Sequence, residues 1–252
     1  MSSTDSKHRN DIYGDNPDGG GRHPDAIPDA IPAATVVLLR ETPQIEVLML
    51  HKTSQIAFGG MWVFPGGRID TEDYPEDKDV NVAARTAAVR ETMEEAGITA
   101  PAAGFVWFAH WTPPPGTPKR FATWFFAAAA DNHEVSIDGG EIQDHQWIRP
   151  ADALAKHAAG EIDLAPPTWV TLFELAGASS IATVLDKFRS RSPRVYETRI
   201  DKRADGVRVA MWKEDVGYAT SDATLSGARH RLYLAPGSFV FEHDAVDYRE
   251  LS

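Results

Sequence analysis

A short segment in the first half of the chain carries three glutamates at helical spacing, and it constrains the fold more than any other feature. The segment reads Arg90-Glu91-Thr92-Met93-Glu94-Glu95-Ala96-Gly97-Ile98. Residues three and four positions apart share one face of an α-helix, so Glu91, Glu94 and Glu95 are expected to project together. Like charges at these spacings destabilise an isolated helix by roughly 0.2 to 0.5 kcal/mol per pair. Because carboxylate oxygens are preferred ligands of magnesium and manganese, the segment predicts a metal site on a helix.

The regions around this helix predict a mixed α and β fold. Asn81 is expected to cap the helix and Gly97 to end it, with alanines between them. The acidic stretch at 68–80 has no apolar period and predicts an exposed loop. Apolar and β-branched runs predict strands at 35–39, 46–50, within 58–67, and at 104–112, 120–129 and 143–148. Two further helices are expected at 150–157 and 167–176.

Composition limits the partners and the metal ligands that the chain can have. A formal net charge of −12, from 37 acidic and 25 basic side chains, disfavours partners such as nucleic acids and anionic membranes. The chain has no cysteine, so a metal would have to be held by oxygen or histidine ligands. Neither a signal-peptide pattern nor an apolar run of about 18 residues is present, so we expect a cytoplasmic protein.

The chain divides into three parts by its composition. Residues 1–32 are rich in Asp, Gly and Pro and are expected to form a disordered or loosely attached N-terminal arm. Residues 33–192 carry the mixed α and β pattern of the predicted main domain. Residues 193–252 contain short strand-like runs separated by glycines, which predict a C-terminal β-rich extension. This extension either lengthens the main sheet or forms a small subdomain.

The glutamate segment and its flanks resemble the signature of the Nudix hydrolase family. The flanks are Val63-Phe64-Pro65-Gly66-Gly67 upstream, Ala87-Ala88-Val89 directly before, and Ala96-Gly97-Ile98 at the end. The family pattern is a glycine, a glutamate, Arg-Glu, an aliphatic residue, any residue, Glu-Glu, any residue, a glycine and an aliphatic residue. The resemblance covers about 33–175 and implies an α/β/α sandwich with a mixed β-sheet. It also implies cleavage of a pyrophosphate bond with Mg²⁺ or Mn²⁺ as cofactor.

The resemblance implies a role for each matching residue. Glu91 and Glu95 are implied to be the primary metal ligands, with the main-chain carbonyl of Gly66 as a further ligand. Glu94 is implied to be either a ligand or the catalytic base. Arg90 is implied to orient these carboxylates through hydrogen bonds, a task that suits its planar guanidinium. The implied reaction is attack of a metal-activated water on one phosphorus.

Residues outside the signature supply the remaining site candidates. In this family the base often comes from a distant loop, and Glu141 is the candidate here, unless it is an ordinary turn residue. Lys119, Arg120 and Phe121 are candidates for substrate binding, because a cation beside an aromatic ring can hold a phosphate while a base stacks. Alternatively, Phe121 belongs to the core and the two cations to a surface loop.

The spacing departs from the family pattern. The family places its arginine fourteen positions after the box glycine, whereas Gly67 and Arg90 are 90 − 67 = 23 positions apart, so the loop is longer. Counting back eight positions from Arg90 gives Val82 where the family has its first glutamate. That glutamate is therefore expected to be missing or replaced by an acidic residue of the loop. The candidates are Glu76, Asp77 and Asp79.

The leading hypothesis is a hydrolase acting on a nucleoside diphosphate linked to another group. The inserted loop, Thr92 at an aliphatic position and the aromatic segment after Ala109 resemble a larger subgroup that includes peroxisomal coenzyme A diphosphatases. The substrate does not follow from this resemblance, and the candidates are a coenzyme A derivative, a dinucleotide, a nucleotide sugar and a modified nucleotide. The alternative is a catalytically silent nucleotide sensor or regulator with the same fold, and a third hypothesis is an acidic scaffold with a solvated helix. A homodimer is left open.

Overall fold

The computed structural model describes residues 29–53, 58–117, 119–130, 134–137, 139–235, 238–248 and 251. Its main sheet has eight strands and is mixed, in the order β3-β2-β1-β6-β5-β8, with β4 paired to β1 and β7 paired to β2. The strands are β1 (Ile31–Glu41), β2 (Ile45–Lys52), β3 (Trp62–Val63), β4 (Gly66–Arg68), β5 (Val106–Thr112), β6 (Phe121–Ala129), β7 (Ile142–Ile148) and β8 (Arg194–Glu197). The predicted N-terminal arm lies almost wholly outside the described residues.

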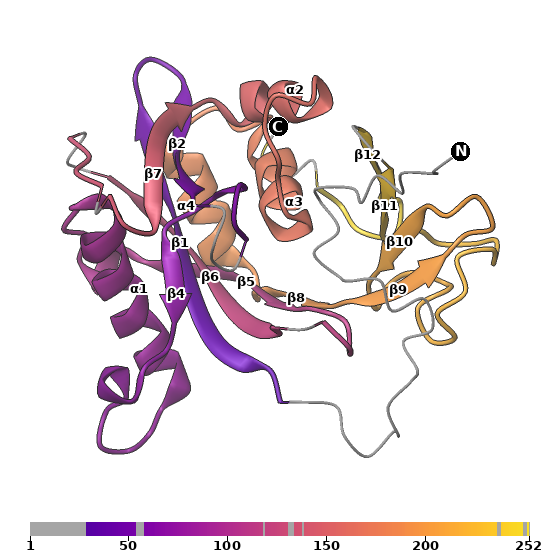
Figure 1. Cartoon of the computed structure of the whole chain (residues 1–252), viewed down its shortest axis with the longest axis horizontal. Coiled ribbons are helices and arrows are strands. Elements are labelled where there is room, and N and C mark those ends of the chain that lie inside the picture. The colour runs from indigo at the N-terminus through magenta and orange to yellow at the C-terminus, as the bar shows by residue number, and fades with distance from the viewer. Residues whose placement is uncertain are drawn as a thin grey trace, which may run out of the picture.

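Helices cover both faces of this sheet, as expected for an α/β/α sandwich (Figure 1). They are α1 (Val80–Ala96), α2 (Pro150–Ala158), α3 (Pro166–Leu175) and α4 (Ile181–Ser190). The alternating side chains of β1 show the two layers, because Val36 and Leu38 pack on the α1 side while Val37 and Leu39 pack toward α3 and α4. No helix among the described residues is long and apolar enough to cross a membrane.

Strand β1 lies at the centre of the sheet and positions the predicted box loop. It pairs with β4 in antiparallel fashion and with β6 in parallel fashion. Thr35 is therefore the register partner of both Gly66 and Phe125. The hydroxyl of Thr35 also donates a hydrogen bond of 2.6 Å to the carbonyl of Pro65. The two consecutive glycines are thus fixed against the middle of the sheet.

Helix α1 approaches the sheet through small side chains. Its side chains that face the sheet include four fully buried alanines, Ala83, Ala84, Ala87 and Ala88. Because alanine is small, the helix backbone can lie close to the strands. Gly97 ends the helix in a left-handed conformation, as predicted. The predicted cap was wrong, because Asp79, not Asn81, accepts the capping hydrogen bond, from the backbone N–H of Asn81.

The C-terminal region both lengthens the main sheet and forms a second sheet, so the two alternatives left open occur together. Strand β8 pairs in parallel with β5 at the edge of the main sheet. The strands β9 (Arg199–Lys202), β10 (Arg208–Met211), β11 (Arg231–Ala235) and β12 (Ser238–Glu242) form an antiparallel four-stranded sheet in the order β12-β11-β10-β9. Figure 1 shows this second sheet on the side of the molecule away from α1. The limits of the predicted domains stay a prediction.

Candidate metal centre and active site

The Gly66-Gly67 segment brings two glutamates of α1 against the backbone of the sheet. The N–H of Gly66 donates a hydrogen bond of 2.9 Å to Oε2 of Glu95. A Cβ atom on Gly67 would overlap the carboxylate of Glu91 where it now lies, so glycine leaves room for that group in its present position. The predicted metal role of the Gly66 carbonyl stays a prediction.

The three glutamates of the segment occupy different environments. The side chain of Glu95 is 6% exposed and that of Glu91 is 14% exposed, whereas the side chain of Glu94 is 57% exposed. Burial raises the pKa of Glu91, although the hydrogen bond from Arg90 opposes this shift. Burial likewise raises the pKa of Glu95, against the opposing charge of Lys52. Two of the three carboxylates therefore face the glycines, and Glu94 projects toward solvent.

Arg90 links these carboxylates to the loop that precedes the helix. One of its terminal nitrogens donates to Glu91 at 2.8 Å and to Glu94 at 3.1 Å. The other donates to the carbonyl of Arg68 at 3.0 Å and to Asp73 at 2.8 Å, and Nε adds a second bond to Asp73 at 3.2 Å. This geometry is what an orienting role for Arg90 requires.

Asp73 is the acidic residue that pairs with Arg90 in this structure. It lies in a short 3₁₀ helix (Thr71–Asp73), and its side chain is only 3% exposed. Burial pushes the pKa of Asp73 upward, but hydrogen bonds and the charge of Arg90 outweigh this and hold the pKa below its usual value. The sequence had predicted an exposed loop over the whole of 68–80. That prediction was wrong for Asp73, which is buried in a short 3₁₀ helix.

The three acidic residues expected to replace the missing glutamate do not pair with Arg90. Asp79 caps α1 and Asp77 accepts a bond from the Asp79 N–H, while Glu76 is exposed. The forward count from the box glycine finds the correct position. The family has its glutamate 14 − 8 = 6 positions after that glycine, and Asp73 is 73 − 67 = 6 positions after Gly67. The extra residues therefore lie between the acidic residue and the helix.

We expect Asp73→Asn to lower the metal affinity or the turnover by about 10- to 100-fold, the usual effect of removing a partner that orients ligands. The substitution keeps the shape of the side chain but removes the charge that holds the Arg90 guanidinium. Activity and Mn²⁺ affinity should be measured beside Asp77→Asn, a substitution at an exposed position of the same loop. Equal effects of the two substitutions would contradict a special role for Asp73.

Lys52 is a site residue that the sequence did not reveal. Its Nζ lies 2.9 Å from Oε1 of Glu95 and 3.7 Å from Oε2 of Glu141. Glu141 lies far from the signature in the sequence, but the pairing of β7 with β2 brings it to the end of β2. The candidate base Glu141 and the signature residue Glu95 are therefore neighbours, linked by one ammonium group.

The substrate-binding candidates lie at and just before the start of β6. Phe121 is the register partner of Ile31, four residues along β1 from Thr35, which corresponds to roughly 13 Å along the strand. Its ring lies 6.4 Å from that of Phe58, centroid to centroid. Arg120 donates a hydrogen bond of 2.9 Å to the carbonyl of Pro113, and Lys119 is exposed. Their role in substrate binding stays a prediction.

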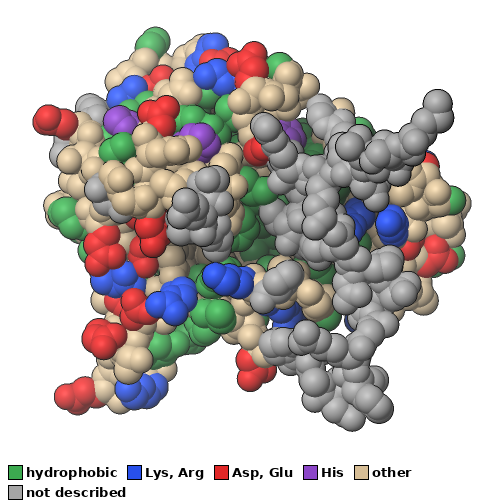
Figure 2. Space-filling view, viewed as in Figure 1, with side chains coloured by type: hydrophobic (Ala, Val, Ile, Leu, Met, Phe, Trp, Pro, Cys, Tyr) green, Lys and Arg blue, Asp and Glu red, His purple; other side chains and the backbone are tan. Residues whose placement is uncertain are grey.

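The donor chemistry of the segment fits a hard divalent cation. Glu91 and Glu95 offer oxygen ligands only, next to the Gly66-Gly67 backbone, and a Cβ atom on Gly66 would overlap the backbone of Ala34 and Thr35. Within the described ranges, no three acidic or histidine groups already form a cluster that could hold a metal. The carboxylates are instead paired with cations, since Arg90 binds Glu91 and Glu94 while Lys52 binds Glu95. Figure 2 shows acidic and basic side chains side by side on the part of the surface that α1 and the adjoining loop form.

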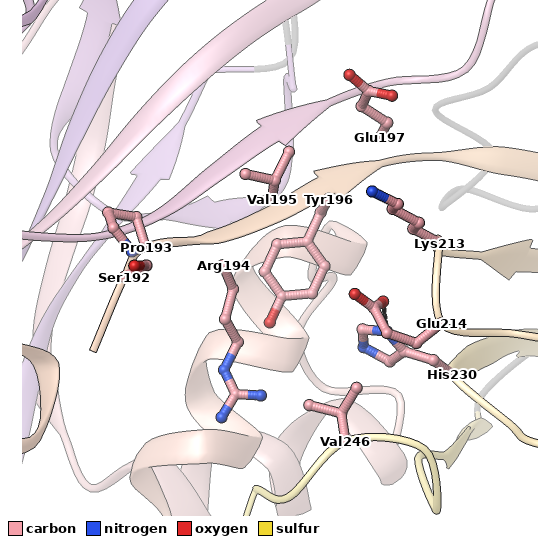
Figure 3. Close-up of a pocket in the computed structure, with 10 residues that line it drawn as sticks. All are labelled: Ser192, Pro193, Arg194, Val195, Tyr196, Glu197, Lys213, Glu214, His230 and Val246. Atoms are coloured by element: carbon pink, nitrogen blue, oxygen red, sulfur yellow. Dashed lines mark hydrogen bonds and ion pairs between the residues drawn. The ribbon is translucent and has the colours of Figure 1, made fainter.

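A separate pocket of about 460 Å³ lies where β8 meets the second sheet (Figure 3). A chain of hydrogen bonds runs along it, from Glu214 to His230 at 2.7 Å and from His230 to Tyr248 at 2.8 Å. Tyr248 in turn bonds the hydroxyl of Tyr196 in β8 at 2.7 Å. These bonds join the C-terminal sheet to the main sheet, and none of the lining residues belongs to α1 or to the glycine segment.

We expect the stability advantage of the wild-type chain over His230→Gln to shrink as the pH falls below about 6.5, the ordinary imidazole value. Burial lowers the pKa of His230, although its hydrogen bond to Glu214 opposes the shift. The unfolded chain therefore binds the proton more readily than the folded one, so acid favours unfolding. Glutamine does not titrate in this range. Urea unfolding from about pH 7.5 to about pH 5.5 tests this, and a constant or growing difference would contradict it.

Comparison with known proteins agrees with this geometry. The model of the NUDIX domain matches residues 30–167, more than half of the chain. The Caenorhabditis elegans protein named nudix hydrolase 7 is 26% identical over an alignment of 187 residues that covers 59% of this chain. The match spans only 60% of the length of that relative. A crystal structure of a NUDIX hydrolase from Alicyclobacillus acidocaldarius superposes on this chain with a TM-score of 0.57 and is 24% identical to it in sequence. The superposition covers 64% of this chain and 97% of the Alicyclobacillus acidocaldarius chain, so the two share a fold. The chain belongs to the NUDIX domain family.

Proposed function

We propose that the protein is a Mg²⁺- or Mn²⁺-dependent hydrolase that cleaves the pyrophosphate bond of a nucleoside diphosphate linked to another group. The observation that carries this proposal is the convergence of Glu91 and Glu95 on the Gly66-Gly67 backbone. Membership of the NUDIX domain family supports the same chemistry. Two carboxylates beside a glycine backbone, which carries no side chains, can hold a cation against the oxygens of a diphosphate.

Each residue of the site has a proposed task. Glu91 and Glu95 would hold the cation, which when bound supplies a Lewis acid that draws charge from the phosphate oxygens. A water molecule attacks one phosphorus, the bridging P–O bond breaks, and the other phosphate leaves with the bond electrons. Glu94 is exposed beside Arg90 and would accept the proton of the water, with Glu141 as the alternative acceptor. Arg90 holds Glu91 and Glu94 in position.

A substrate panel with Mg²⁺ tests the proposal. The panel contains a coenzyme A derivative, a dinucleotide and a nucleotide sugar, and products are separated by chromatography. We expect turnover of at least one compound by the wild-type chain, loss of that turnover in excess chelator, and none above background for Glu91→Gln. If no compound is turned over faster than with Glu91→Gln, the proposed reaction is wrong.

The same substrate panel also tests the alternative hypothesis of a catalytically silent nucleotide sensor. That hypothesis rested on the missing box glutamate and on the unassigned C-terminal tail, and the pair formed by Asp73 and Arg90 weakens the first of these two motives. A sensor would bind a nucleotide without cleaving it. Calorimetric binding of a panel compound without hydrolysis over hours would favour it.

A further inference from the structure

Lys52 is held in place at the end of β2 by its backbone. Its N–H donates to the carbonyl of Met61 at 3.1 Å, and its own carbonyl accepts from Gly60 at 3.0 Å. The ladder between β2 and β7 shifts register between His51 and Lys52, which marks a bulge or irregularity there. Bulges redirect side chains, and the side chain of Lys52 is only 11% exposed. The backbone therefore fixes where the ammonium group can reach.

Both oxygens of Glu95 already have partners in the folded protein. Oε2 accepts the hydrogen bond from Gly66, and Oε1 lies 2.9 Å from Nζ of Lys52. Burying a carboxylate without a partner is costly, so the lysine stabilises the charged form of a side chain that is 6% exposed. A cation that binds Oε1 must therefore compete with Lys52.

The ammonium group has a second acidic neighbour. Glu141 lies 3.7 Å from Nζ, and its side chain is 61% exposed, so it can adjust its position. Lysine presents a compact charge on a flexible stem, which suits a change of partner better than the rigid fork of arginine does. Lys52 can thus leave Oε1 of Glu95 without becoming unpaired, by moving fully onto Glu141.

We propose that Lys52 is a positioning residue that holds the Glu95 carboxylate ready for a divalent cation and competes with that cation for Oε1. This inference rests on the proposed metal role of Glu95 but on no particular substrate. Removing the ammonium group then strengthens cation binding, since Glu95 loses its competing partner. Removing it also lowers the stability of the cation-free protein. Of its two contacts, the buried Glu95 carboxylate then keeps the one with the Gly66 N–H and loses the one with Lys52.

Mn²⁺ binding to the full-length chain, followed by the electron paramagnetic resonance signal of free Mn²⁺ at about pH 8, tests the proposal without a turnover assay. We expect Lys52→Met to bind Mn²⁺ on the order of tenfold more tightly than wild type, given the strength of a partly buried charge pair. Saturating Mn²⁺ should also raise its unfolding temperature more than that of wild type. Unchanged or weaker binding by Lys52→Met would overturn the proposal.

Two further variants complete the test. Lys187→Met removes the same charge from an exposed position on α4, so it measures the effect of net charge alone, and its affinity should stay within about twofold of wild type. Lys52→Arg should bind Mn²⁺ several-fold less tightly, because a guanidinium holds a carboxylate more firmly. If Lys52→Met does not fold, equal or tighter binding by Lys52→Arg overturns the proposal. Failure of every variant and of the wild type to bind Mn²⁺ would contradict the proposed function as well.

Discussion

Replacing Glu94 by glutamine is expected to lower kcat by about 10²- to 10⁴-fold, the usual contribution of a positioned general base. Glutamine keeps the size of the side chain but cannot accept a proton. The side chain of Glu94 is 57% exposed and accepts a 3.1 Å hydrogen bond from Arg90, which would keep its bonds to Glu91 and Asp73 in the variant. Stability should therefore change by less than about 0.5 kcal/mol, so the loss of activity would be chemical.

Two comparisons make this measurement decisive. Glu76→Gln changes an exposed glutamate of the inserted loop in the same way and should leave kcat within about twofold of wild type. Glu141→Gln tests the alternative base, which lies 3.7 Å from Nζ of Lys52. If Glu141→Gln reduces kcat strongly while Glu94→Gln does not, the proton acceptor is Glu141, and the assignment to Glu94 is wrong.

Replacing Arg231 by methionine is expected to lower the free energy of unfolding by about 3 to 5 kcal/mol, the cost of leaving one charge of a buried pair alone. Arg231 and Asp215 both have fully buried side chains and form two parallel hydrogen bonds, one of them 2.6 Å long from Nε. Arg231 also donates to the carbonyl of Ala223 at 2.6 Å. Without the guanidinium, Asp215 keeps only backbone donors, from Gly217 and His230.

The exposed pair of Arg203 and Asp205 provides the matched control. Its atoms lie 2.8 Å apart, but about half of each side chain is exposed, so Arg203→Met should cost no more than about 1 kcal/mol. Urea unfolding gives both values. The double variant Arg231→Met with Asp215→Leu should be more stable than Arg231→Met alone, because it leaves no buried charge. Equal costs for Arg231→Met and Arg203→Met would show that burial does not govern this pair.

The strands and the central helix could be predicted because their signals are local. Alternating or continuous apolar runs indicated β1, β2, β5, β6 and β7, and the alanines with Gly97 indicated α1. Helix α4 was missed although it is as long as α3 and carries local signals, a Ser180 cap and a buried apolar face of Val184, Leu185 and Phe188. Phe188 of that helix stacks on Phe108 of β5 at 4.4 Å between ring centroids. This contact across the sheet, unlike the cap and the apolar face, could not be read from the sequence.

The site was predictable where the signature is contiguous and unpredictable where it depends on distant contacts. Arg90, Glu91 and Glu95 come together as their spacing indicates. Asp73 was missed because the backward count passed through the inserted residues, although the forward count from Gly67 reaches it. Lys52 was missed because nothing near it in the sequence indicates that β2 ends beside Glu95. Whether Glu94 or Glu141 accepts the proton stays a prediction.

The position of β8 implies that the segment matching the NUDIX domain is smaller than the unit that can fold. Tyr196 of β8 stacks on Trp111 at 3.7 Å, and the N–H of Thr198 bonds the carbonyl of Thr112. A fragment ending at residue 167 would lose β8, α4 and nearly all of α3, leaving the edge of β5 unpaired and the apolar face of the sheet bare. Open edges and apolar patches promote self-association. Truncation to the matched segment should therefore yield aggregates, whatever the state of its catalytic residues.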